Sequence, residues 1–131
     1  MVKAMQAEAK IWFSLAEDDY KNAQLLWENH RYGATVFFYQ QAVEKILKAY
    51  IVQVKKKLPP KTHRIEYLIT TAGLDVRDIE SPEVTELSKA YIRVRYPDLS
   101  RAYYQKRDRV EPLVTMSERV YLWVKKKFKK T

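Results

Sequence analysis

The sequence predicts an all-α protein, an antiparallel up-and-down bundle of four to five helices. Only two glycines occur in 131 residues, so the chain is poor in the turn residues that separate short strands. Apolar residues recur through long stretches at a spacing near 3.6, as in amphipathic helices. No internal repeat and no long linker divides the chain. Residues 1–131 are therefore expected to form a single helical domain.

The first two helices are expected to form an antiparallel pair. The first spans about residues 4–28, and its apolar face carries Trp12, Leu15, Ala16, Ala23 and Leu26. A short break at residues 29–33 turns the chain back. The second helix, about residues 34–54, has apolar residues around most of its circumference, which predicts a central position. Pro59 and Pro60 are expected to stop it.

Capping residues and prolines place two further helices. A short third helix is expected after Thr62, its N-cap, and ends near Gly73. The fourth is expected to begin at Ser81 and Pro82, a capping residue followed by proline at the first helical position. It must stop before Pro97, because proline disfavours helix at the residue before it.

The C-terminal part of the chain is expected to contain a loop and a last helix. The loop covers residues 96–107, and the helix starts between Asp108 and Pro112. A core-facing stripe runs along this helix at helical spacing: Val110, Leu113, Val114, Ser117, Tyr121, Val124 and Phe128.

Composition excludes several kinds of site. The chain has no cysteine, which excludes disulfides and thiolate metal sites and fits a reducing compartment. The N-terminus is too polar for a signal peptide, and no apolar run approaches the roughly 18 residues of a membrane span. We therefore expect a cytoplasmic protein without membrane contact. His30 and His63 lack the carboxylate spacing of a metal site, so a helix-end role and a capping or packing role are expected, with no metal or cofactor.

Charge is unevenly distributed along the chain, whose net charge is +9. Residues 45–64 and 89–109 are basic, and residues 75–86 between them are acidic. Two interpretations fit this pattern: a polyanionic partner, or solvated lysine faces on a helical protein.

Two groups of polar side chains lie on otherwise apolar helices. Asp19 projects from the apolar face of the first helix, and an unpaired buried carboxylate costs several kcal/mol. Arg95 is the expected partner. Phe37, Gln41, Glu44 and Lys48 form a mixed stripe on the second helix. This stripe suits a subunit interface or a ligand pocket, or it is a solvent face with a Glu44–Lys48 pair worth a few tenths of a kcal/mol.

Residues 95–107 interleave cations with tyrosines, a composition that suits a nucleotide or a single strand. Alternatively, Tyr96 and Pro97 pack the segment down and its cations are merely solvated. The predicted ligand site contains Arg95, Tyr96, Asp98, Arg101, Tyr103, Tyr104, Gln41, Lys45 and Lys48.

Three segments, in order, resemble the HEPN family: Asp19 between Ala16 and Ala23, residues 37–50, and residues 91–98. The resemblance covers nearly the whole chain and is to small stand-alone prokaryotic members. It implies an all-helical homodimer that binds a nucleotide or RNA. It also implies a minimal nucleotidyltransferase as partner, in a two-component system of the toxin–antitoxin type. Under this resemblance, the stripe on the second helix is interpreted as an interface or pocket.

Ribonuclease members of this family carry an arginine followed a few residues later by histidine and then tyrosine. Here Arg95 is followed at that spacing by Arg101 and then Tyr103, so the histidine is replaced. A guanidinium stays protonated and is poorly suited to shuttle a proton at neutral pH. Binding without catalysis is therefore the leading prediction. The alternatives are a metal-independent ribonuclease that uses these three residues and a non-catalytic dimeric interaction protein.

Overall fold

A computed structural model describes residues 5–128 of the chain, and this range is helical without strands. The helices are α1 (Ala7–Glu28), α2 (Tyr32–Tyr50), α3 (Ile65–Thr71), α4 (Thr85–Arg93), α5 (Pro97–Tyr104) and α6 (Arg107–Lys127). A π-helical turn, η1 (Ile51–Lys55), continues α2, and a 3-10 turn, η2 (Val76–Ile79), precedes α4. The prediction of an all-α bundle is confirmed, with α5 as an additional short helix.

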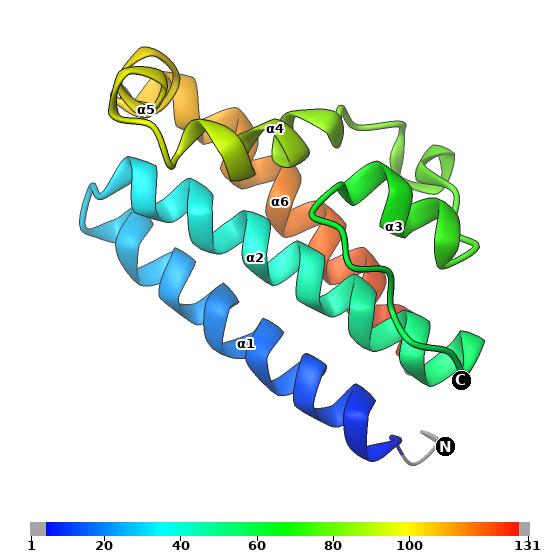
Figure 1. Ribbon diagram of the computed structural model, residues 1–131. Coiled ribbons are helices and arrows are strands. Elements are labelled where there is room, and N and C mark those ends of the chain that lie inside the picture. The colour runs from blue at the N-terminus through cyan, green and yellow to red at the C-terminus, as the bar shows by residue number, and fades with distance from the viewer. Residues whose placement is uncertain (1–4, 129–131) are drawn as a thin grey trace.

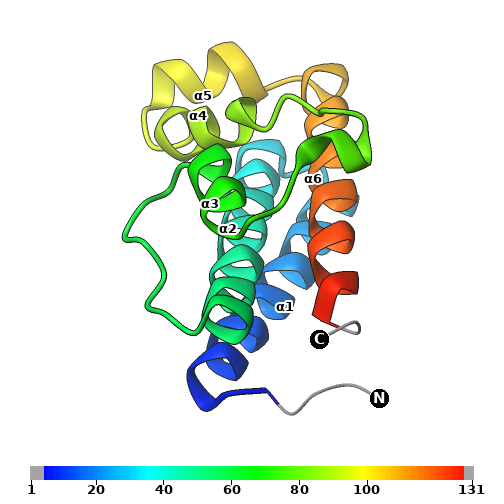
Figure 2. The same ribbon diagram turned by 90° about the vertical axis from the view of Figure 1, so that its right-hand side faces the viewer.

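The bundle is organised around α2. Helix α1 packs along α2, and α6 packs against another side of it (Figure 1). The short helices α5, α4 and α3 follow one another along α2, with α5 near the start of α2 and α3 beside its C-terminal half (Figure 1). A view turned by 90° also shows α3 beside α2, below α4 and α5 (Figure 2). Val36, Val43, Ile46 and Leu47 of α2 are fully buried, which confirms the predicted central position. None of the helices between residues 5 and 128 combines the length and apolarity needed to cross a membrane.

The end of α2 and the start of α3 differ from the expected boundaries. The helical run ends at Lys56, whose φ of 57° is left-handed, so it stops before Pro59 is reached. Thr62 is not the N-cap of α3, which begins at Ile65. Instead, the Thr62 hydroxyl accepts a hydrogen bond from the Arg64 backbone N–H at 3.2 Å.

The start of α4 was also predicted too early. Ser81 has a φ of 49°, a left-handed conformation that belongs to the turn after η2. Because Ser81 closes that turn, with its N–H bonded to the Val76 carbonyl at 2.8 Å, it does not cap the helix. Helix α4 begins at Thr85 and ends at Arg93, before Pro97 as expected.

The prediction of a loop over residues 96–107 is wrong, because residues 97–104 form α5. Tyr96 is extended, with φ of −111° and ψ of 120°, and Pro97 occupies the first helical position. Proline is favoured there because its missing N–H would have no partner in the helix. The Ser100 N–H bonds to the Tyr96 carbonyl at 2.8 Å. Pro97 therefore ends one helical segment and starts the next.

Helix α6 begins at Arg107, one residue before the expected range. Its predicted core stripe is confirmed, since all seven side chains are buried. Between α6, α1 and α2 lies a tyrosine cluster. The rings of Tyr20 and Tyr121 stack at 4.1 Å, and Tyr39 meets Tyr20 edge-to-face at 5.8 Å. The Tyr39 hydroxyl donates to Glu118 at 3.0 Å, and the Tyr121 hydroxyl donates to Glu17.

This cluster predicts loss of stability in alkali. Burial, followed by nearby carboxylates, raises the pKa of Tyr20 to about 12, and burial also raises the pKa values of Tyr39 and Tyr121. The folded state therefore holds these protons above the unfolded pKa of about 10. Their contribution to stability is complete below that pH and is lost as pH rises toward 12 and beyond. Urea unfolding between pH 8 and 11.5 should show a falling midpoint above pH 10. A flat midpoint would contradict the raised values.

Candidate functional site

Asp19 has a different partner from the one predicted. Its carboxylate pairs with the Lys45 ammonium of α2 at 2.6 Å, and the two side chains are 13% and 21% exposed. Arg95 instead lies beyond the end of α4, with its guanidinium 4.1 Å from the centre of the Tyr91 ring. The prediction of an Asp19–Arg95 pair is therefore wrong. Lys45 sits on the helix adjacent to α1, and a cation at that position satisfies Asp19.

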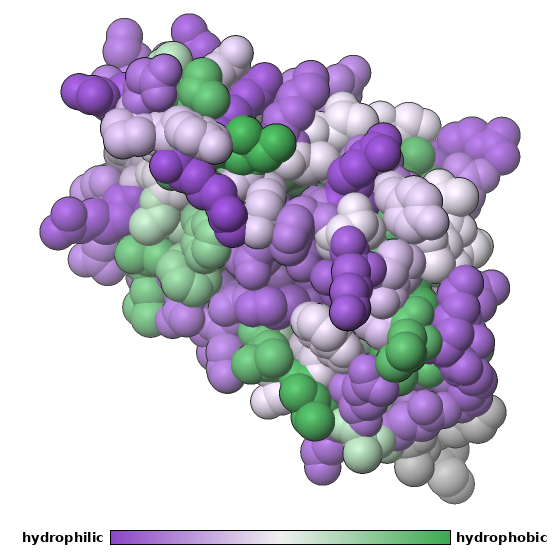
Figure 3. All heavy atoms as spheres, viewed as in Figure 1, coloured by the Kyte–Doolittle hydropathy of each residue, from purple (hydrophilic) through white to green (hydrophobic). Residues whose placement is uncertain are grey.

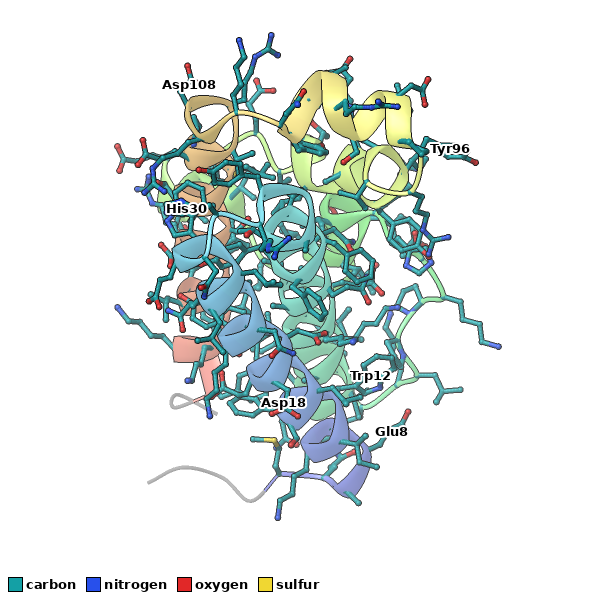
Figure 4. All side chains as sticks on the ribbon, turned by 90° about the vertical axis from the view of Figure 1, so that its left-hand side faces the viewer. Glu8, Trp12, Asp18, His30, Tyr96 and Asp108 are labelled. Atoms are coloured by element: carbon teal, nitrogen blue, oxygen red, sulfur yellow. The ribbon has the colours of Figure 1, made fainter. Side chains whose placement is uncertain are left out.

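The polar stripe on α2 is buried at Glu44 and Lys48 and half-buried at Phe37 and Gln41, so it is not a solvent face. Glu44 and Lys48 are only 5% and 8% exposed at their side chains and pair at 3.0 Å. The Gln40 amide donates to the other Glu44 oxygen, Oε1, at 3.0 Å, and Gln41 donates to Gln40 at 2.7 Å. The Lys48 ammonium also lies 5.3 Å from the centre of the Trp12 ring. Figure 4 shows Trp12 projecting from α1 toward the side of the molecule on which the α2–α3 connection runs.

His63, in the α2–α3 connection, joins this stripe to α4. Its Nδ1 lies 2.9 Å from Glu44 Oε1, and its backbone carbonyl accepts from Gln40 at 3.3 Å. The His63 ring stacks on Tyr91, with centroids 3.7 Å apart and planes 12° apart. Sequence reasoning gave His63 a capping or packing role and did not connect it to Glu44. The two are 19 positions apart, and only the path of the connection brings them together.

A second assembly surrounds a cavity of about 400 Å³ formed by α4, α5, α6 and the turn before α4. Its apolar floor is made by Pro112, Leu113 and Met116. Its polar and aromatic wall contains Arg93, Tyr103, Tyr104, Arg109, Glu83 and Glu86. A cavity of this size and mixed lining is typical of small-ligand sites.

Arg93 organises the aromatic wall of this cavity. Its guanidinium lies 3.8 Å from the centre of the Tyr103 ring and donates to Glu86 at 2.9 Å. Burial opposes its charge, but hydrogen bonds with Tyr104 and Glu86 hold the pKa of Arg93 above its ordinary value. Burial would raise the pKa of Glu86, yet the hydrogen bond and charge of Arg93 lower it. Both groups therefore stay ionised at neutral pH.

A basic hollow of about 190 Å³ adjoins this cavity, because Arg109 lines both. Arg101 and Lys106 also line it, together with Ala102 and Gln105. Arg101 donates to the Pro97 carbonyl at 3.3 Å. Among the described residues, no carboxylate forms an ion pair with these three cations. The surface over α5 is mostly hydrophilic in Figure 3. The hollow is thus an uncompensated positive site.

The predicted ligand residues are divided among separate places. Tyr103, Tyr104 and Arg101 come together around the cavity and its basic hollow. Tyr104 is only 7% exposed, so it forms the wall and offers no free face. Arg95 lies at the His63–Tyr91 stack, while Lys45, Lys48 and Gln41 are engaged on α2. Tyr96 is exposed at the turn before α5 (Figure 4), and exposed Asp98 lies in the first turn of that helix.

Arg93 and Arg109 were not predicted as site residues. Their signal in the sequence was weak, because Arg93 lies before and Arg109 lies beyond the tyrosine-rich segment of residues 95–107. Within residues 5–128, no group of three or more His, Asp or Glu side chains is placed to hold a metal ion.

Comparison with known proteins places the chain in a family. The HEPN domain model matches residues 9–127. The crystal structure of TT1696 from Thermus thermophilus is similar, with a TM-score of 0.71 and 26% sequence identity, over 93% of this chain and 99% of that chain. A comparison with curated proteins gave no match. Since the family match extends over nearly all of the sequence, this chain belongs to the HEPN domain family.

Proposed function

We propose that this protein binds a nucleotide or single-stranded RNA in the cavity between α4, α5 and α6. The observation that carries the proposal is the continuity of an aromatic cavity with a basic hollow through Arg109. Such a surface matches a ligand with a planar apolar part joined to phosphate. Membership of the HEPN family supports the same class of ligand.

The base would lie in the cavity. Tyr103 is 37% exposed, and Arg93 covers one face of its ring. The remaining surface of the ring is open to stack on a base, a contact worth about 1–3 kcal/mol and tolerant of base identity. Leu113 and Met116 supply the apolar floor. The carboxylates of Glu83 and Glu86 on the wall favour base edges that carry amino groups.

The phosphates would lie in the basic hollow. Arg101 and Arg109 present guanidinium groups that grip phosphate oxygens in two-point contacts, and Lys106 adds a third cation. Because no carboxylate among the described residues is paired with these cations, a polyanion could bind them without breaking an ion pair. The affinity would then depend strongly on salt, because bound phosphates release counterions.

The proposed protein partners rest on membership of the HEPN family and not on the geometry of the cavity. We propose a homodimer that works in the cytoplasm with a minimal nucleotidyltransferase, as one component of a toxin–antitoxin type system. Sedimentation equilibrium measures the mass of the assembly and so tests the homodimer. Co-expression and co-purification with a nucleotidyltransferase encoded beside this chain test the proposed partner. A chain that elutes alone would contradict this partner.

The test of the ligand is a titration of the purified protein with ATP and with a short labelled single-stranded RNA, at 50 and 200 mM salt. We expect RNA binding that weakens at the higher salt, competition by ATP, and no cleavage on a gel run from every point. Salt-independent binding, or none, would contradict the proposed site. Cleavage would assign the protein to the ribonucleases instead.

A further inference from the structure

The layered cluster of His63, Tyr91 and Arg95 is a second site, distinct from the cavity. None of the three residues lines the cavity or the basic hollow. His63 and Arg95 each lie about one ring thickness from Tyr91, at 3.7 and 4.1 Å from its centre. Two groups so close to one ring centre would overlap on the same face. They therefore cover opposite faces of the ring. Tyr91 thus separates His63, which can gain a proton, from Arg95, which is always charged.

The orientation of the His63 ring is fixed by buried groups. Its Nδ1 faces the carboxylate of Glu44, which is 5% exposed, while the His63 side chain is 47% exposed. Gln40 donates both to Glu44 and to the His63 carbonyl, so ring and backbone are held together. The hydrogen bond to Glu44 occupies Nδ1, which leaves Nε2 for other partners. No described residue forms a hydrogen bond with Nε2.

We propose that this cluster binds a phosphodiester of a nucleic-acid strand and that protonation of His63 switches the site on. In the neutral ring, the Nδ1 hydrogen is directed to Glu44, so Nε2 is an acceptor and gives a phosphate oxygen no donor. In the protonated ring, Nε2 becomes a charged donor. Arg95, joined to the Tyr91 hydroxyl by a hydrogen bond, supplies the second cation.

The surroundings of His63 allow this switch. From α2 it faces Glu44, whose charge is balanced by Lys48 when the ring is neutral. Protonation therefore adds one positive charge to an almost neutral group. From α4 it faces Tyr91 and, beyond that ring, Arg95; within its own segment, neighbouring Arg64 is already paired with Glu66 at 2.9 Å.

The direction of the pH effect follows from linkage. Because binding requires the protonated ring, the complex takes up a proton. Affinity is therefore highest where the ring is protonated, and it falls by up to tenfold per pH unit as rising pH removes that proton. A phosphodiester keeps its single negative charge near neutral pH, so the change in affinity belongs to the protein.

The experiment follows a labelled single-stranded oligouridylate by fluorescence anisotropy from pH 5.5 to 8.5 at constant ionic strength. It compares the wild type with His63→Gln, which keeps a donor for Glu44 but cannot gain a proton. His30→Gln is the matched control, because His30 sits at the α1–α2 turn with Tyr32 as its hydrogen-bond partner. We expect wild type and His30→Gln to lose affinity with rising pH. His63→Gln should be independent of pH, at the affinity that wild type shows at high pH.

Two further arms keep the result decisive. Arg95→Gln, at an exposed position, should lower affinity at every pH and retain the pH slope. The same series is repeated in the double variant Arg101→Ala/Arg109→Ala, which lacks the cations of the cavity site. Any strand binding that this variant retains belongs to the His63 cluster, so the two proposed sites are tested separately. Inorganic phosphate at equal ionic strength should compete only weakly, because it offers one phosphate group and no strand. Displacement as effective, mole for mole, as by unlabelled oligouridylate would overturn the strand as ligand. The proposal is also overturned if His63→Gln keeps the wild-type slope, or if Arg95→Gln binds as wild type.

Discussion

Replacing Glu44 with alanine is expected to lower the free energy of unfolding by about 3–5 kcal/mol, the usual cost of breaking a buried ion pair. The substitution leaves the Lys48 ammonium, 8% exposed, without its carboxylate. It also removes the acceptor used by Gln40 and His63. Since domains of this size are stable by only about 5–15 kcal/mol, the midpoint of urea unfolding should fall steeply.

The control is Glu80→Ala, which removes a carboxylate that is 83% exposed and paired with Arg119 at the surface. Its expected cost is below about 1 kcal/mol. Adding Lys48→Met to Glu44→Ala should recover part of the loss, because the uncompensated cation is then gone. A Glu44→Ala protein as stable as Glu80→Ala would show that the buried network contributes little.

Removing Arg101 and Arg109 together is expected to have the largest effect on ligand binding. Each charge-assisted hydrogen bond to phosphate contributes about 1.5–3 kcal/mol, so the double alanine variant should bind RNA at least about a hundredfold more weakly. If each guanidinium neutralises one phosphate, the slope of log affinity against log salt should fall by about 1.4. Anisotropy titrations at four salt concentrations measure both quantities.

A matched control removes two arginines elsewhere. Arg77→Ala/Arg119→Ala changes the net charge equally, but these side chains are paired with Asp75 and Glu80. Neither lines the cavity or its basic hollow. This variant should keep most of the affinity and the salt slope. Equal losses in the two double variants would mean that net charge, and not the basic hollow, drives binding.

The helical periodicity of the sequence was enough to predict the bundle and its core. The stripe from Val110 to Phe128 and the apolar circumference of α2 follow directly from burial of side chains at helical spacing. Local signals were less reliable where one residue serves two purposes. Pro97 ends the α4 segment and also starts α5, and only the second role makes residues 97–104 helical.

The candidate sites were harder to predict, because they depend on contacts between distant residues. Asp19 clearly needed a cation, but only the packing of α1 against α2 shows that Lys45, and not the expected Arg95, supplies it. His63 is part of a candidate site only because it contacts Glu44 and Tyr91, which the fold brings to it from α2 and α4. Tyr103 belongs to a segment that interleaves cations with tyrosines, yet the cation on its ring is Arg93, which lies before that segment on α4.

The most direct test of nucleotide binding in the α4–α5–α6 cavity is methionine methyl NMR with 13C-labelled protein. Met116 lies in the floor of the cavity, whereas Met5 packs against the core near the start of α1. Met116→Leu assigns the first signal, and Met5 serves as the internal control. Titration with ATP should shift the Met116 methyl signal in a saturable manner and leave Met5 unchanged. A Met116 signal that does not move while ATP binds would place the ligand elsewhere and contradict the proposed site.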